Sequence, residues 1–266
     1  MSRKRLAIIG NGMATSRLLY ELLRRSAGTL FAITVYGEEP RGSYNRILLG
    51  RVLCGSQPDE ITMKPREWYA ERAVKLEPGV RVTNVDAVAR KLTISTGETV
   101  PYDVCVFATG SSPRVPTVHG LRTEDGSPRD GVFVFRTIED CLAIREKARP
   151  CSSAVVVGGR LLGLEAAKAL GDLGLHVTVL HLNPVLMNSQ LDHHGGVLLK
   201  RAIEKMGIFV RTGCTAEEIL GNGHVEAVKL STGEVIPADL VVFSCGIVPR
   251  TEVAKASGVT TADPTS

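Results

Sequence analysis

Apolar residues along the chain follow two spacings, one typical of buried strands and one of amphipathic helices. A short apolar run at residues 6–9 is followed by apolar positions at helical spacing over residues 14–23, and then by a second run at residues 33–36. The same order of runs returns at residues 154–157, 161–173 and 177–180. Because neighbouring parallel strands need a crossover connection, each series predicts a βαβ unit with a parallel sheet.

A duplicated segment relates the two halves of the chain. Residues 95–114 and 231–250 are identical at eleven of twenty positions, at a constant offset of 136. Short runs at residues 82–85, 92–95 and 225–230 alternate or are apolar and are broken by glycines, as in antiparallel strands. The sequence therefore predicts an α/β protein of two Rossmann-like three-layer nucleotide-binding units, each with a small antiparallel β insert.

Glycine and proline mark the expected boundaries of these units. Both residue types are frequent between positions 113 and 150, as in a connection between domains. We expect a first nucleotide-binding domain at residues 1–115, continued by residues 247–266. A connection at residues 116–150 leads to the second domain at residues 151–246.

Composition narrows the class of partner. The 266 residues are 44% hydrophobic and carry a net charge of +4 with both signs interspersed, which excludes a disordered chain and gives no footprint for nucleic acid or anionic lipid. No stretch approaches the roughly 20 apolar residues of a membrane span, and the apolar run after the basic start is too short for a signal peptide. We expect a cytoplasmic protein with small-molecule partners.

The six cysteines argue against a metal or a redox disulfide. No Cys-x-x-Cys and no other close pair occurs among them, so iron–sulfur, zinc and vicinal disulfide sites are disfavoured. Several lie in apolar strands, where a reduced thiol packs as a small hydrophobic group. We expect reduced thiols and no metal.

The first glycine-rich turn reads Gly10-Asn11-Gly12-Met13-Ala14-Thr15 and lies between a strand and a helix. There, Gly10 permits the tight turn, and Gly12 lets a pyrophosphate approach the backbone and the positive end of the helix. The third motif position is usually glycine or alanine, and Thr15 departs from it. Glu38 and Glu39 follow the next strand and are candidates for accepting hydrogen bonds from ribose hydroxyls, the alternative being a solvated loop.

The second turn reads Gly158-Gly159-Arg160-Leu161-Leu162-Gly163. Here Arg160 replaces the glycine that a diphosphate would approach, so binding is either blocked or rearranged, or the guanidinium forks onto phosphate oxygens. After the following strand, His181 occupies the position where an acidic residue would select NADH. Because neither Asp nor Arg stands there, the sequence does not distinguish NADH from NADPH.

Several longer segments carry a resemblance to a known family. They are residues 37–49 with Tyr-Asn-Arg, the Ala-Thr-Gly at 108–110, residues 158–167 with Leu-Glu-Ala-Ala, and residues 181–192. The chain resembles the FAD-dependent pyridine nucleotide-disulfide oxidoreductases, and most closely the N-terminal FAD- and NAD(P)H-binding part of NADH-dependent nitrite reductase large subunits. Compared with that family, we expect the sequence to stop before the closing FAD segment and the interface domain.

The resemblance implies a site for each cofactor. The first unit would bind FAD and the second NAD(P)H, with hydride passing from nicotinamide to flavin. The cofactor-binding candidates are Gly10, Asn11, Gly12, Met13, Ala14, Glu38, Glu39, Arg46, Thr109 and Gly110 for FAD, and Gly158, Arg160, Leu161, Gly163, His181 and Gly246 for the nicotinamide nucleotide.

Two charged residues are candidates for a catalytic role. The family pairs a lysine with the glutamate of the second glycine-rich helix, and the matching residues here are Arg51 and Glu165. An ion pair between them near the flavin would favour the anionic reduced flavin. The alternative is two unrelated surface charges, which are common.

Three functional hypotheses follow. The first is an FAD-dependent NAD(P)H oxidoreductase that passes electrons to an unidentified acceptor, with redox proteins among the candidates. The second is a truncated, catalytically compromised nucleotide-binding fragment, which Arg160 and the end of the sequence favour. The third is a rubredoxin or ferredoxin reductase.

Overall fold

The computed structural model describes residues 2–262, which divide into two units. Within this range, unit 1 comprises residues 2–46, 59–112 and 248–262, and unit 2 comprises Ile47–Pro58 and Pro113–Ile247. The segment that the sequence suggested as a connection, residues 116–150, is thus part of unit 2, and so is the short segment of residues 47–58.

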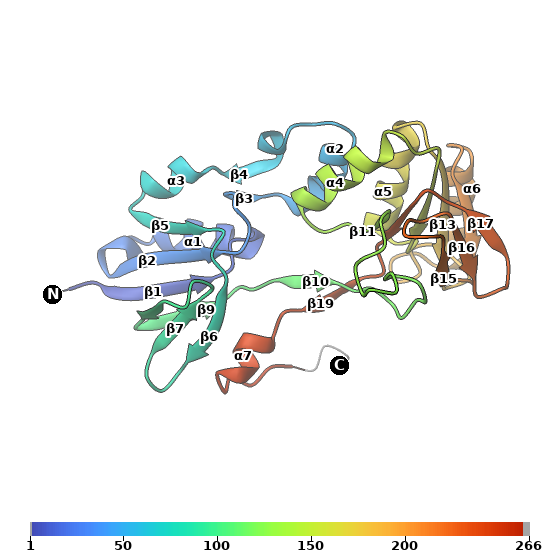
Figure 1. Ribbon diagram of the computed structural model, residues 1–266. Helices are drawn as coiled ribbons and strands as arrows, with labels where there is room; N and C mark the ends of the chain where they lie inside the picture. The colour runs from blue at the N-terminus through green and yellow to red at the C-terminus, as the bar shows by residue number, and fades with distance from the viewer. Residues whose placement is uncertain (1, 263–266) are drawn as a thin grey trace. The chain divides into compact units, whose positions relative to one another are not determined.

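Unit 1 is built on a parallel sheet of four strands in the order β5-β2-β1-β9 (Figure 1). The strands are β1 (Lys4–Ile9), β2 (Phe31–Gly37), β5 (Val74–Pro78) and β9 (Val104–Phe107). Because β1 lies between β2 and β9, the loops after β1 and β2 on one side and after β9 on the other meet at the switch point of the sheet. Ligands of open α/β sheets bind at this place.

The two faces of this sheet are covered by different layers. Leu6 and Ile8 pack against helix α1 (Met13–Arg24), whose apolar stripe includes the buried Leu19. On the other face, Ala7 and Ile9 pack against a three-stranded antiparallel sheet of β6 (Val82–Asp86), β7 (Lys91–Ile94) and β8 (Thr99–Pro101). The alternation of β1 side chains between the two faces has the period of 2 that a strand requires. Unit 1 also contains β3 (Ser43–Tyr44), β4 (Thr62–Lys64), α3 (Arg66–Ala70) and α7 (Glu252–Ala256).

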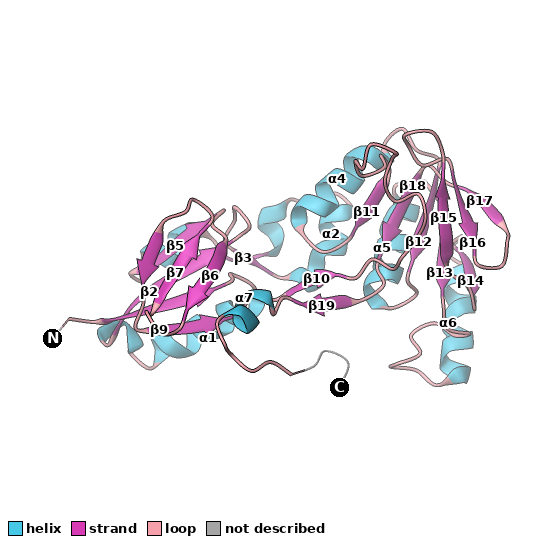
Figure 2. Cartoon of the chain, turned by 60° about the horizontal axis from the view of Figure 1, so that its bottom comes forward, coloured by secondary structure: helices cyan, strands magenta, loops and turns pink. Residues whose placement is uncertain are grey.

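Unit 2 repeats this architecture with a larger sheet. Its parallel order is β11-β18-β12-β13-β14, so that β12 lies between β13 and β18 as β1 lies between β2 and β9. The strands are β11 (Val132–Val134), β12 (Ser153–Val157), β13 (His176–His181), β14 (Phe209–Thr212) and β18 (Leu240–Phe243). An antiparallel sheet of β15 (Ala216–Leu220), β16 (Ala227–Leu230) and β17 (Val235–Pro237) covers one face (Figure 2). The predicted fold class, with its two inserts, is confirmed.

The helices of unit 2 begin in two different ways. Thr137 and Asp140 form a capping box at the start of α4 (Ile138–Ala148), and the Asp192 carboxylate caps α6 (His193–Glu204) by accepting from Gly195 N at 2.7 Å. In contrast, α5 (Leu161–Asp172) has no side-chain cap. Its uncapped amino end follows the second glycine-rich turn. The remaining helix is α2 (Leu49–Leu53).

Two short strands, β10 (Ser111–Pro113) and β19 (Ile247–Pro249), pair with each other and carry the chain across the boundary of the units. They are the ends of the two duplicated segments. Arg250 N donates to Gly110 O at 3.0 Å, and Arg114 N donates to Gly246 O at 2.9 Å. The two bonds are equivalent at the offset of 136, so the duplication is preserved in the hydrogen bonds of its last residues.

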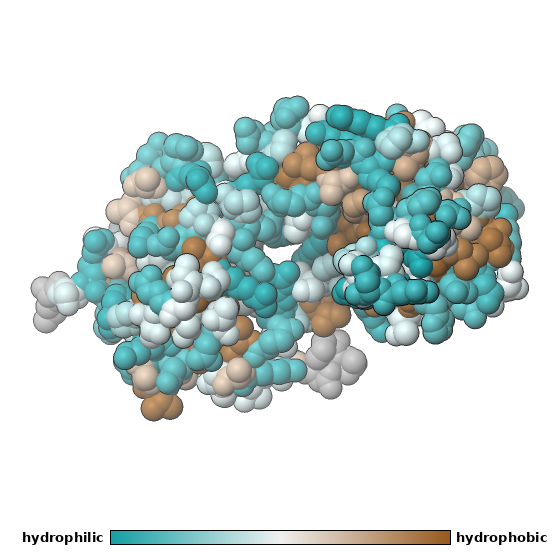
Figure 3. Space-filling model, in the orientation of Figure 1, coloured by the Kyte–Doolittle hydropathy of each residue, from teal (hydrophilic) through white to brown (hydrophobic). Residues whose placement is uncertain are grey.

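Apolar side chains gather in the cores described above. On the face in Figure 3, the apolar side chains that remain visible form small groups separated by hydrophilic ones. Within residues 2–262, no helix is long and apolar enough to cross a membrane.

Candidate functional site

The turn after β1 is fixed by the strands on either side of it. Gly10 has φ +106°, and a Cβ placed there would lie 2.1 Å from the carbonyl oxygen of Ala108, so glycine is required. Gly10 N donates to Tyr36 O and Ala108 N donates to Ile9 O, both at 2.8 Å. The turn is therefore held at the switch point from both sides.

Beyond this turn, the amino end of α1 is open. Gly12 is the N-cap residue, no side chain caps the helix, and a Cβ on Gly12 would find no atom within 4 Å. Met13 and Ala14 begin the helix, half-buried and exposed respectively. Free amides, the positive helix end and the absence of a side chain at Gly12 suit the diphosphate of a dinucleotide.

The Asn11 side chain positions the turn. Its Oδ1 accepts from the hydroxyl of the buried Tyr69 at 2.7 Å, and its Nδ2 donates to Arg41 O at 3.4 Å. A Cβ on Gly37 would lie 3.0 Å from the Asn11 Cβ, so the small residue at the end of β2 makes room for it. Asn11 is thus tied to the rest of unit 1 through its side chain.

The two glutamates after β2 have different partners. Glu39 forms an ion pair with Arg46 and accepts from the Tyr44 hydroxyl at 2.5 Å, while Arg46 Nη1 donates to the same hydroxyl at 2.7 Å. Glu38 is exposed and its carboxylate forms an ion pair with Arg250. A second ion pair joins Glu38 Oε1 to Arg81 Nη1 at 3.8 Å. The Arg46 guanidinium, a candidate for contacting FAD, is therefore engaged with Glu39 and Tyr44.

Arg250 connects the other candidates of unit 1. Its carbonyl oxygen accepts from the Thr109 hydroxyl at 2.6 Å, its amide donates to Gly110, and its guanidinium reaches Glu38 and Ser112. The sequence reasoning did not single out Arg250. Its identity with Arg114 in the duplicated segment was the signal that could have found it.

The second turn repeats the geometry of the first. Gly158 has φ +126°, and a Cβ there would lie 2.2 Å from Ser244 O. Gly158 N donates to Leu180 O and Ser244 N to Val157 O, both at 2.8 Å, as in the turn after β1. The duplicated segment thus supplies the residue that each glycine approaches, Ala108 in one unit and Ser244 in the other.

Arg160 leaves the backbone of this turn unchanged. As the N-cap of α5 it has φ −102° and ψ 178°, close to the −87° and −168° of Gly12. Any residue adopts this extended conformation. The Arg160 side chain is exposed and has no hydrogen-bond or ion-pair partner among residues 2–262. Arg160 in place of glycine therefore leaves the backbone at the start of α5 similar to that at the start of α1.

His181 and Gly159 lock the turn from the other side. His181 is buried, and its Nδ1 accepts from Gly159 N at 3.2 Å while its Nε2 lies 3.3 Å from Asn188 Oδ1. This pairing is satisfied by the neutral tautomer with the proton on Nε2. Burial lowers the pKa of His181, the positive charge of Arg160 lowers it further, and the bond to Asn188 partly offsets both. A Cβ on Gly159 would lie 2.5 Å from Leu186, so this glycine, absent from the candidates, is required for packing.

Arg51 and Glu165 do not form the expected ion pair. Arg51 is exposed on α2 and has no salt-bridge partner among residues 2–262. Glu165 on α5 has a buried Oε2 with no hydrogen-bond partner in the same range. Gly50 of α2 lies near Glu165, since a Cβ on it would lie 3.8 Å from the Glu165 Cβ. Burial raises the pKa of Glu165.

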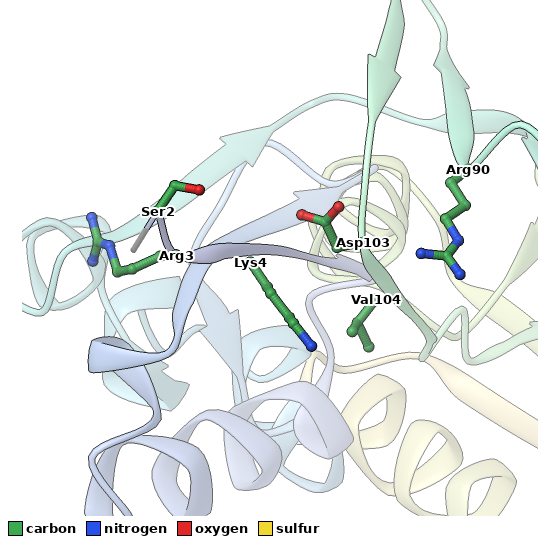
Figure 4. A pocket seen from close by; sticks show the side chains of 6 residues that line it. All are labelled: Ser2, Arg3, Lys4, Arg90, Asp103 and Val104. Carbon is green, nitrogen blue, oxygen red and sulfur yellow. The ribbon is translucent and has the colours of Figure 1, made fainter.

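One pocket of unit 1 lies away from these turns. A pocket lined by Ser2, Arg3, Lys4, Arg90, Asp103 and Val104 lies where β1 and β9 begin (Figure 4). That is the amino end of the sheet, opposite to the end where α/β proteins bind ligands. No metal-binding group of three or more His, Cys, Asp or Glu side chains occurs among the described residues, and all six cysteines are free thiols.

Comparison with known proteins identifies relatives of the chain. It is 40% identical over 262 residues to the nitrite reductase (NADH) large subunit of Escherichia coli, covering 97% of this chain and 30% of that protein. It is 33% identical over 255 residues to the ferredoxin–NAD(+) reductase component of the biphenyl dioxygenase system of Paraburkholderia xenovorans, covering 96% of this chain and 60% of the relative. The chain thus spans about a third of the length of its nitrite reductase relatives.

A solved structure shows the same fold. The ferredoxin reductase of Rhodopseudomonas palustris superposes with a TM-score of 0.88 at 28% identity, covering 98% of this chain and 63% of that one. The model of the pyridine nucleotide-disulphide oxidoreductases matches residues 4–264. The resemblance that the motifs carried is confirmed, and the chain belongs to the pyridine nucleotide-disulphide oxidoreductase family.

Proposed function

We propose that the chain is an FAD-dependent NAD(P)H oxidoreductase, with FAD in unit 1 and the nicotinamide nucleotide in unit 2. The observation that carries this proposal is the open amino end of α1 at the switch point of its sheet, where Gly12 leaves space beside free amides. The equivalent turn before α5 supports a second dinucleotide in unit 2. We also propose that the protein is cytoplasmic.

In unit 1, the turn from Gly10 to Ala14 would hold the FAD diphosphate by its backbone amides. Glu38, at the end of β2, would accept hydrogen bonds from the ribose, with Arg250 orienting its carboxylate. Glu39 and Arg46 would shape the site through their bonds with Tyr44 rather than each contacting FAD as a free charge. Bound FAD supplies the hydride-accepting and electron-releasing chemistry.

In unit 2, Glu165 would contact the nicotinamide nucleotide. Its buried Oε2 lacks a partner, and a nicotinamide carboxamide offers an N–H donor that would satisfy it. Gly50 lies against Glu165, since a Cβ built on it would be 3.8 Å from the Glu165 Cβ. Arg51 is exposed on α2, the helix that contains Gly50. We propose no role for it beyond adding a positive charge to that helix.

The electron acceptor is proposed to be a redox protein. A relative named as a ferredoxin–NAD(+) reductase component and the ferredoxin reductase structure both support a ferredoxin-type acceptor. The nitrite reductase relatives support an alternative in which the electrons pass to further modules for nitrite reduction.

Anaerobic spectroscopy with a matched pair of glycine variants tests the proposal. We expect the protein to bind FAD, show flavin absorbance, and lose it on addition of NADH or NADPH. Gly12→Val should fold normally, because no protein atom lies within 4 Å of the added Cβ, but should lose FAD affinity by tenfold or more, on the order of a lost phosphate contact. Gly28→Ala, at another open glycine of unit 1, should bind FAD as the wild type does.

Two results would overturn the proposal. One is a wild-type protein that binds no FAD by calorimetry, and the other is bound FAD that neither nucleotide reduces. The second result would instead support the compromised fragment considered from the sequence. If the flavin is reduced, comparison of ferricyanide with a [2Fe–2S] ferredoxin as oxidant assigns the class of acceptor.

A further inference from the structure

We propose that Arg160 is a specificity-determining residue that binds the 2′-phosphate of NADPH, so that the nucleotide site of unit 2 prefers NADPH over NADH. This inference rests on the proposed function of unit 2 and names its substrate.

The end of β13 lacks the group that binds the ribose of NADH. In dinucleotide-binding units, a carboxylate at this strand end accepts from the ribose 2′-hydroxyl, and an arginine nearby accommodates a 2′-phosphate instead. Here the strand ends at His181, followed by the exposed Leu182 and by Asn183. None of the three is a carboxylate.

The His181 side chain is itself unavailable to a ligand. It is 5% exposed, and its two ring nitrogens are engaged with Gly159 N at 3.2 Å and Asn188 at 3.3 Å. His181 therefore holds the turn in place and presents no charge of its own to a ribose. The polar recognition at this strand end must come from a neighbouring side chain.

Arg160 is the cation beside this position. It directly follows Gly159, whose amide is bound to His181, and it begins α5 with an exposed side chain. The positive charge of Arg160 contributes to lowering the pKa of His181. Its guanidinium has no partner in residues 2–262, so it is free to form a two-pronged bond with a phosphate.

The steric alternative is weaker in this structure. Arg160 has nearly the backbone conformation of Gly12, so α5 starts as α1 does and its first amides remain exposed by the same geometry. Because the side chain is in solvent, it can turn away from the diphosphate path at the cost of a rotamer change. A dianionic 2′-phosphate compensates that cost, and NADH has none to offer.

Calorimetry with two fragments of the nucleotide separates the 2′-phosphate from the rest. The ligands are adenosine 2′,5′-bisphosphate and 5′-AMP, which differ only in the 2′-phosphate, titrated into the FAD-loaded wild type and into Arg160→Gln, Arg160→Lys and Arg160→Gly. Arg149→Gln, an exposed arginine at the end of α4, is the matched control for loss of one charge in unit 2.

We expect the wild type to bind the bisphosphate at least tenfold more tightly than 5′-AMP, and Arg160→Gln to remove that difference while leaving 5′-AMP unchanged. Arg160→Lys should keep part of the difference, and Arg149→Gln all of it. Equal losses for both ligands in Arg160→Gln would overturn the proposal, because they would place the guanidinium on the shared 5′-phosphate. Tighter binding of both ligands to Arg160→Gly would overturn it in favour of steric blocking.

Flavin reduction distinguishes failure of this inference from failure of the proposed function. If NADH and NADPH at limiting concentration reduce the flavin equally fast, the proposed preference for NADPH is wrong. The proposed oxidoreductase activity is not contradicted by that result. A flavin reduced by neither would end the proposed function, while the calorimetry would still report on Arg160.

Discussion

The hydroxyl of Thr15 donates a hydrogen bond of 2.7 Å to the carbonyl oxygen of Gly10, five residues earlier. In unit 2 the equivalent pair is Gly163 and Gly158, and a Cβ on Gly163 would lie 1.8 Å from the Gly158 oxygen. In both units the helix lies close to the turn before it, but different residues permit this. In unit 2, Gly163 has no side chain at the contact, whereas in unit 1 the buried Thr15 hydroxyl donates to the carbonyl group.

Replacing Thr15 tests this relationship in unit 1. Thr15→Val keeps the shape of the side chain but removes the donor, and should lower the free energy of unfolding by about 1 kcal/mol through loss of the buried hydrogen bond. Thr15→Ser retains the hydroxyl and should lose less. Urea denaturation followed by circular dichroism measures both. A Val variant as stable as the wild type would show that the bond contributes nothing.

Two glycines of α5 should respond to alanine with opposite signs. Gly163→Ala forces a Cβ against the Gly158 oxygen, and such overpacking costs about 1–3 kcal/mol. Gly171→Ala in the same helix meets its nearest atom, Ile208 Cγ1, at 3.9 Å and should stabilise the helix by about 0.5–1 kcal/mol. Thermal unfolding of the two variants beside the wild type provides the comparison. Destabilisation by both, to the same extent, would contradict the special packing of Gly163.

The fold was predictable because its signals are local and repeated. Apolar runs, helical spacing and the 136-residue offset each point to the same βαβ order, and the sheets confirm it. Gly10 and Gly158 were predictable for the same reason, since a strand followed by glycine and a helix leaves few backbone choices. Both have positive φ values, and a Cβ placed on Gly10 or Gly158 would lie 2.1 or 2.2 Å from a carbonyl oxygen.

The features of the fold and of the site that could not be predicted from the sequence depend on contacts between residues far apart in the chain. Arg250 meets Glu38 across 212 residues, and nothing in the local sequence of either announces the other. Gly50 of the short helix α2 lies near Glu165 while Arg51 is exposed, and matching the charges in the sequence does not determine how that helix is rotated. The β11 strand was overlooked because its three residues lie in a segment rich in glycine and proline.

Replacing Glu165 should raise the stability of the protein at pH 7 and slow flavin reduction. Burial raises the pKa of its carboxyl group, so the folded protein holds a proton more tightly there than the unfolded chain does. The stability that this proton brings is present below the unfolded pKa of about 4.3 and is lost as pH rises through the folded pKa. Glu165→Gln should therefore unfold at a higher urea concentration than the wild type at pH 7, and at nearly the same concentration near pH 4.

The same variant should slow flavin reduction by NAD(P)H by about tenfold, because a carboxylate that positions the nucleotide has been replaced. Stopped-flow reduction under anaerobic conditions measures the rate. Glu124→Gln, an exposed glutamate of unit 2, is the control and should change neither stability nor rate. A Glu165→Gln protein that gains no stability at pH 7 would contradict the unsatisfied Oε2.

Acid should weaken both units through a pair of equivalent aspartates. Asp103 accepts from Arg5 N at 2.7 Å, Nε at 3.0 Å and Nη2 at 2.8 Å, and these bonds hold its pKa well below the usual range. Asp239, 136 positions later, is partly desolvated, which raises its pKa. The hydrogen bonds from Ser152 and Ser153 lower that pKa by more, so the net shift is a decrease.

A carboxylate with a depressed folded pKa stabilises the fold above the unfolded pKa of about 3.9, and that stability disappears as pH falls towards the folded value. Asp103→Asn and Asp239→Asn should therefore be less stable than the wild type at pH 7, and the difference should shrink as the pH is lowered from about 4. Urea midpoints at pH 7, 5 and 3.5 test this against Asp59→Asn, an exposed aspartate outside these clusters, whose difference from the wild type should not vary in the same way.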